Sequence, residues 1–101
     1  MIPVVGPVIQ SPTPTHPAVD IACIPGSAVR AMANGYGSFS WSPTMGWVFT
    51  QGDIVLSHLR NRGVDRYYNV GEVVSACGST GRLSNGPHVH IEGPPEVLKG
   101  F

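Results

Sequence analysis

The apolar segments of this 101-residue chain are short, and none keeps the 3.6-residue apolar period of a helix over a sustained length. Thirteen glycines and ten prolines break up the sequence, and pairs such as Pro25-Gly26 and Asn34-Gly35 are turn signals. Many of the remaining residues are Val, Ile, Thr and Ser, which suit short strands. We therefore predict an almost all-β fold in one small domain, since the chain is long enough for one core but not for two.

The same signals divide the chain into segments. Residues 1–15 carry four prolines and read as an extended lead-in with little regular structure. The predicted strands are 19–24, 27–33, 36–41, 47–49, 54–56, 71–77 and 87–92. Residues 60–68 are the most polar segment and are expected to form a solvated connection. The predicted core therefore spans residues 16–93, followed by a tail at 94–101 that leaves the sheet.

Charge and hydropathy exclude several partners. Only 12% of the residues are charged and the formal net charge is zero, which gives no electrostatic reason to expect binding to nucleic acid or to an anionic membrane. No apolar stretch approaches the length of a membrane span, so we expect no membrane insertion. The N-terminus also lacks the pattern of a secretory signal. Action outside a cell would then require a larger parent chain, a virion or a lysis pore.

Two cysteines, Cys23 and Cys77, stand far apart in the sequence and belong to no CxxC motif. A structural zinc held by cysteines is therefore not expected. We interpret them as two small buried thiols, because free cysteine packs as a small hydrophobe. A disulfide is the alternative, since each cysteine lies close to a segment that carries candidate site residues.

The histidines are the strongest chemical signal. His88 and His90 are one residue apart in a predicted strand, so their side chains point to the same face. His16, with Asp20 four residues later, supplies a second pair of candidate ligands, and His58 lies between the two pairs. These positions account for all four histidines of the chain, which makes a zinc site the first hypothesis. An isolated H-x-H pair fits hydrogen-bonded strand histidines equally well.

His16 and Asp20 can bind one metal ion only if the chain bends between them. Pro17 keeps His16 out of the helical region, so the two side chains do not share a helix face. In a fully extended strand, the Cα atoms of His16 and Asp20 would lie about 13 Å apart, too far for two ligands of one zinc. We therefore expect the chain to bend at Pro17-Ala18, with Asp20 opening the strand beyond.

Three blocks of sequence follow one another in a distinctive order. The first runs from His16 to Gly26 and contains the His-x-x-x-Asp pattern, and the second is Ser57-His58-Leu59. The third joins Gly71-Glu72-Val73-Val74, Gly78-Ser79-Thr80-Gly81 and Gly86-Pro87-His88-Val89-His90-Ile91-Glu92. Together they resemble the LytM/lysostaphin-type zinc metallopeptidases, the M23 family of peptidoglycan endopeptidases. The resemblance extends over most of the chain, from about His16 to Glu92.

The resemblance implies a fold and a set of roles. The fold would be a single domain of mostly antiparallel strands, LytM/M23-like with a duplicated hybrid motif, with an open substrate groove. The implied ligands of one catalytic zinc ion are His16, Asp20 and His90. His58 and His88 would be catalytic: one would help to deprotonate a water molecule, and the other would hydrogen-bond the tetrahedral oxyanion. Glu92 would be a carboxylate beside the site or on the surface rather than a ligand.

The implied function is a zinc endopeptidase that hydrolyses cross-bridge or stem-peptide bonds in bacterial peptidoglycan. Such a protein would act outside the cell, in the cell wall or periplasm, as a phage lysin, as part of a phage virion, or within a larger parent chain. One alternative is a non-catalytic LytM-like module that binds wall, activates an amidase or serves as a structural part of a virion. Another is a D-Ala-D-Ala carboxypeptidase, which would need a glutamate base, and Glu92 alone is placed for that role.

Overall fold

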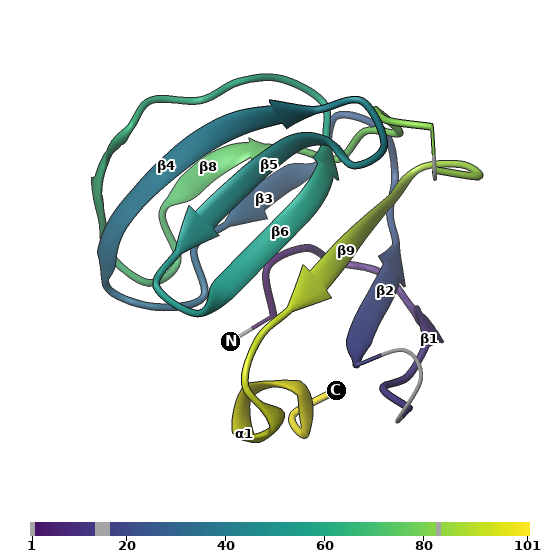
Figure 1. The fold of residues 1–101 in the computed structure, drawn as a ribbon. Coiled ribbons are helices and arrows are strands. Elements are labelled where there is room, and N and C mark those ends of the chain that lie inside the picture. The colour runs from purple at the N-terminus through teal and green to yellow at the C-terminus, as the bar shows by residue number, and fades with distance from the viewer. Residues whose placement is uncertain (1, 14–16, 83) are drawn as a thin grey trace.

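The computed structural model describes residues 2–13, 17–82 and 84–101, and these residues form nine strands and one short helix (Figure 1). Seven of the strands form one sheet in the order β1-β2-β9-β6-β5-β4-β7, and β3 and β8 form a second sheet. Every pairing is antiparallel. The large sheet consists of β1 (Val8–Gln10), β2 (Ala18–Ala22), β9 (His88–Glu92), β6 (Ile54–Leu59), β5 (Gly46–Gln51), β4 (Gly35–Ser42) and β7 (Arg66–Tyr68). The small sheet consists of β3 (Ala28–Arg30) and β8 (Val73–Ala76). The predicted all-β class is confirmed.

One hydrophobic core joins the two sheets. Val29 of β3 and Val74 of β8 belong to the same buried cluster as the inward-facing residues of the large sheet. Phe49 is fully buried at its centre and contacts the rings of Phe39 and Tyr68, with ring centroids 5.1 and 5.4 Å away. These side chains fill one face of the large sheet, which leaves the opposite face to carry polar groups.

Regular structure extends beyond the predicted segments at both ends. The strand β1 lies within the proline-rich lead-in, where we predicted little regular structure, and pairs with β2. The tail forms the helix α1 (Pro95–Leu98), which begins with proline in its first turn and buries Leu98. The polar connection ends in β7, whose Tyr68 is buried. Short elements of three or four residues carry too little periodicity to be distinguished from loops in the sequence.

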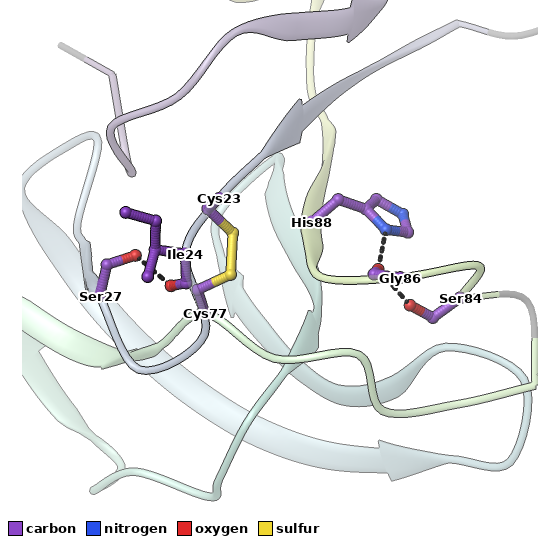
Figure 2. The surroundings of a disulfide bond; sticks show 7 residues. All are labelled: Cys23, Ile24, Ser27, Cys77, Ser84, Gly86 and His88. Carbon is purple, nitrogen blue, oxygen red and sulfur yellow. Dashed lines mark hydrogen bonds between the residues drawn. A yellow bond between two sulfur atoms is a disulfide. The ribbon is translucent and has the colours of Figure 1, made fainter.

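The cysteines form a disulfide, so the interpretation as two buried thiols is wrong (Figure 2). Cys23 directly follows β2 and Cys77 directly follows β8, and their Cα atoms lie 6.2 Å apart. Backbone hydrogen bonds hold both neighbourhoods: the amide of Gly26 donates to the carbonyl of Cys77, and the amide of Cys77 donates to Ser27. The bond ties the strand that carries Asp20 to the segment that begins at Gly78.

Of the residues that the structure describes, none belongs to a helix long and apolar enough to cross a membrane.

Candidate metal and catalytic site

The candidate site is built on the neighbouring strands β2 and β9. Their pairing register places Asp20 opposite His90 and Ala22 opposite His88. Side chains alternate along each strand, so the residues between these positions, Val19, Ile21, Val89 and Ile91, fill the core and are at most 1% exposed. Asp20, His88 and His90 therefore lie on the opposite face of the sheet, as the H-x-H spacing predicted. Asp20 is the middle residue of β2 rather than its first, so the expectation that it opens the strand is wrong.

Asp20 and His90 face each other at short distance. The Oδ1 atom of Asp20 lies 2.9 Å from Nδ1 of His90 and 3.9 Å from Nε2 of His88. The Asp20 and His90 side chains are only 13% and 14% exposed, so neither is fully hydrated. A carboxylate and an imidazole at this separation match two ligands of one zinc ion, which stand roughly 3 Å apart when each is about 2 Å from the metal.

A β-bulge brings His58 to the same face. Between the pairs Trp47–Leu59 and Phe49–Leu56 the register of β5 and β6 shifts, so that two residues of β6 oppose one residue of β5. His58 lies in this bulge and has a φ of 65°, the only positive φ among the described non-glycine residues. In regular alternation His58 would point into the core with Leu56. The bulge turns it toward the site instead.

His58 is held in one tautomer. Its ring Nδ1 lies 2.7 Å from the carbonyl oxygen of Thr80, and because a carbonyl only accepts, Nδ1 carries the hydrogen. The neutral ring thus presents an unprotonated Nε2. Burial lowers the pKa of His58 below 6.5, the Thr80 hydrogen bond partly opposes this shift, and the charges of His88 and His90 lower the pKa further. His58 is consequently a neutral base at neutral pH.

His88 is fixed in the same way, and Figure 2 shows the contact. Its Nδ1 donates to the carbonyl oxygen of Gly86 at 2.9 Å, and the hydroxyl of Ser84 donates to the same oxygen. The backbone amide of His88 donates to Gly78. The His88 ring centroid lies 4.8 Å from that of His58, and the His90 centroid lies 6.1 Å from that of His58. Three imidazoles and one carboxylate are thereby grouped.

The Gly-Ser-Thr-Gly string supports this group through its backbone. The hydroxyl of Thr80 donates to the carbonyl of Leu59 and accepts from the amide of Trp47, which fixes the carbonyl that His58 uses. Gly81 has a φ of 87°, and a Cβ there would lie 2.4 Å from the backbone nitrogen of Gly46. Any residue with a Cβ at position 81 would collide with the backbone of Gly46 unless the loop moved.

The grouped side chains line an open groove of about 840 Å³. Strand β1 contributes Ile9 and Gln10, the β4–β5 turn contributes Met45, and Glu92 lies at the end of β9. Ile9, Gln10 and Met45 belong to no recognisable motif, so they could not be predicted as site residues. Ser57 is not one of the predicted site residues, yet it is the direct partner of His90 across β6 and β9, and its buried hydroxyl has no hydrogen-bond partner among the described residues.

The metal site cannot be completed from residues 2–13, 17–82 and 84–101, which contain no group of three or more His, Cys, Asp and Glu side chains arranged to hold a metal ion. The predicted ligand His16 lies outside the described residues. Asp20 and His90 supply two of the three predicted ligands, and an oxygen and a nitrogen donor suit zinc. The two described donors therefore suit zinc, but a third protein ligand is not among the described residues.

Comparison of the sequence with known protein families and with curated proteins finds no match. Solved structures do match. A candidate M23 peptidase from Pseudomonas aeruginosa aligns with 90% of this chain at a TM-score of 0.73 and 28% sequence identity. The chain shares the M23 peptidase fold. A zinc-containing peptidase from Vibrio cholerae aligns with 89% of the chain at a TM-score of 0.72 and 21% identity, which supports the fold alone.

This chain aligns with less than half of each of these proteins. The chain spans 42% of the Pseudomonas protein and 34% of the Vibrio protein. The comparison therefore concerns the fold around the groove and not the activity of the longer proteins. Within that fold, the described residues bring together four of the five predicted site residues: Asp20, His58, His88 and His90.

Proposed function

We propose that this chain is a zinc-dependent peptidase that hydrolyses peptide bonds of bacterial peptidoglycan. The observation that supports this most is the convergence of Asp20, His58, His88 and His90 in one groove of an M23-like fold. We include His16 as the third zinc ligand on the sequence pattern alone. Because peptidoglycan lies outside the cytoplasmic membrane, the protein would act in the cell wall or periplasm, or be delivered there by a virion or a larger parent chain.

The chemistry divides between the metal and the two histidines that are not ligands. Zinc, when bound, supplies Lewis-acid activation of water and of the scissile carbonyl. His58 is assigned the role of general base, because its Nδ1 is committed to Thr80 and its lowered pKa keeps Nε2 unprotonated. Its Nε2 takes a proton from the attacking water and can later return one to the leaving amine.

His88 is assigned the role of hydrogen-bond donor to the oxyanion. Its Nδ1 is committed to Gly86, so Nε2 is the atom available to the substrate. A protonated Nε2 donates a hydrogen bond to the negative oxygen that develops on the scissile carbonyl. The absence of an HExxH motif is then no obstacle, since imidazoles perform both tasks.

Two variants separate ligands from catalysts. His90→Ala should abolish stoichiometric zinc binding, whereas His88→Ala should retain zinc and lose most of its activity on purified peptidoglycan. Metal content is measured by atomic absorption after dialysis, and activity by released amino groups. If His88→Ala loses zinc as readily as His90→Ala, the division is wrong. If the wild type binds one zinc ion and releases no amino groups from several wall types, the non-catalytic wall-binding or structural alternative replaces the peptidase.

A further inference from the structure

Each ring nitrogen of His90 faces a different carboxylate. Nδ1 lies 2.9 Å from Oδ1 of Asp20, and Nε2 lies 3.2 Å from Oε2 of Glu92. The two contacts differ in their surroundings: the Asp20 side chain is 13% exposed and the Glu92 side chain is 51% exposed. His90 is thus held from both ends of its ring.

A neutral imidazole has one N–H group, so it donates to only one of these two carboxylates. Its other nitrogen then directs a lone pair at a carboxylate oxygen, an arrangement that a cation between the two atoms would stabilise. The Asp20 side is the better place for the cation, because the Asp20 carboxylate is much more buried than that of Glu92. The hydrogen of the ring therefore belongs on the Glu92 side.

We propose that Glu92 is a positioning residue that accepts the Nε2 hydrogen of His90 and so directs the bare Nδ1 toward Asp20 and the metal. This inference rests on the proposed zinc-dependent function. A carboxylate behind a ligating histidine fixes the orientation of the ring and raises the basicity of the ligand. Glu92 would thereby strengthen zinc binding without touching the ion.

Within the described residues, the Glu92 carboxylate contacts His90 and has apolar cross-strand neighbours. Its cross-strand neighbours are Ala18 on β2 and Val55 on β6, neither of which has a charged or polar side chain. The Oε2 atom of Glu92 lies 3.2 Å from Nε2 of His90. The alternation of β9 directs Glu92 into the same groove as His90, two residues earlier.

Zinc affinity tests the proposal first. We would compare wild type, Glu92→Ala and Glu92→Gln by competition with a chromophoric chelator. Glu92→Ala should bind zinc about 10–100-fold more weakly, and Glu92→Gln, whose amide oxygen still accepts a hydrogen bond, should lose less. Glu96→Gln is the matched control, because it also removes one exposed carboxylate and lies in α1 rather than beside His90. Urea unfolding of the metal-free variants checks that their stability is unchanged.

The tautomer of His90 is the second readout, and a merely structural role would not move it. Long-range ¹H–¹⁵N spectra of the zinc-loaded wild type should show Nδ1 bound to metal and the hydrogen on Nε2. Metal on Nε2 instead would overturn the proposal and make Glu92 a ligand. A Glu92→Ala zinc affinity within twofold of wild type would also overturn it.

Failure of this proposal and failure of the proposed function give different results. A wild type that binds zinc with the expected tautomer but cleaves no wall peptide contradicts the peptidase and supports Glu92. A wild type that cleaves wall while Glu92→Ala keeps full affinity contradicts only Glu92. A wild type that binds no zinc contradicts both.

Discussion

The ring of His58 donates a 2.7 Å hydrogen bond to the backbone carbonyl of Thr80, twenty-two residues away in the sequence. That carbonyl is itself fixed by the Thr80 hydroxyl, which donates to Leu59 and accepts from Trp47. The loop 78–81 thus orients a proposed catalytic side chain without contributing one of its own. The loop holds the His58 ring in one tautomer.

Loss of the Thr80 hydroxyl should loosen this support. Thr80→Val keeps the side-chain shape but leaves the buried Leu59 carbonyl and the Trp47 amide without their partner, so the free energy of unfolding should fall by roughly 1–3 kcal/mol. Thr80→Ser retains the hydroxyl and should lose less than about 1 kcal/mol. Urea denaturation followed by tryptophan fluorescence measures both. A Thr80→Val variant at least as stable as Thr80→Ser would contradict the proposed support of the loop by the hydroxyl.

Gly81 should tolerate substitution worse than a glycine of similar φ in open space. At Gly52, with φ 58°, an added Cβ meets no atom within 4 Å, so Gly52→Ala should lose about 1–2 kcal/mol of stability from backbone strain alone. At Gly81 the Cβ also collides with the backbone of Gly46, so Gly81→Ala should lose a further 1–3 kcal/mol. Thermal unfolding compares the two. Similar losses would show that the 78–81 loop moves away from the β4–β5 turn at little energetic cost.

The disulfide should contribute much of the stability of so small a domain. Cys23 and Cys77 are 54 residues apart, and closing a loop of that length corresponds to roughly 4 kcal/mol in the chain-entropy view. The double variant Cys23→Ala/Cys77→Ala should lose about this amount in urea denaturation. Because Cys77 directly precedes Gly78, whose carbonyl accepts from His88, zinc affinity should also decline. Unchanged stability in the double variant and in reduced wild type would contradict this account.

The buried His58 should make the metal-free protein less stable in mild acid. Its pKa is lowered in the folded state from an ordinary value of 6.5, so below that pH the unfolded chain takes up a proton that the folded chain does not. Stability should therefore fall as the pH drops through 6.5, and this loss should level off below the folded-state pKa. His58→Asn lacks the titrating group and suits a positive φ. With a chelator present, the stability of wild type relative to His58→Asn should fall between pH 7 and pH 5; a constant difference would contradict the burial effect.

The sequence predicted those parts of the fold that depend on local patterns. Alternation along β2 and β9 follows from residue spacing, so the shared face of His88 and His90 could be predicted directly. The orientation of His58 could not, because it depends on a bulge and a positive φ that arise from pairing between β5 and β6. The disulfide could be given only as the alternative to two free thiols for a similar reason: the packing of the two sheets brings the ends of β2 and β8 together. His16 remains a prediction, since it lies outside the described residues.

The most direct test of the account is digestion of purified peptidoglycan by the zinc-loaded protein, with released amino groups as the readout and His58→Asn as the comparison. Atomic absorption first confirms that both proteins carry one zinc ion. We expect new amino termini from wild type and at least about a hundredfold slower release from the variant, since general base catalysis contributes about that factor. Equal release by the two proteins would contradict the assignment of His58 as the base. No release by either protein from several wall types would contradict the peptidase itself.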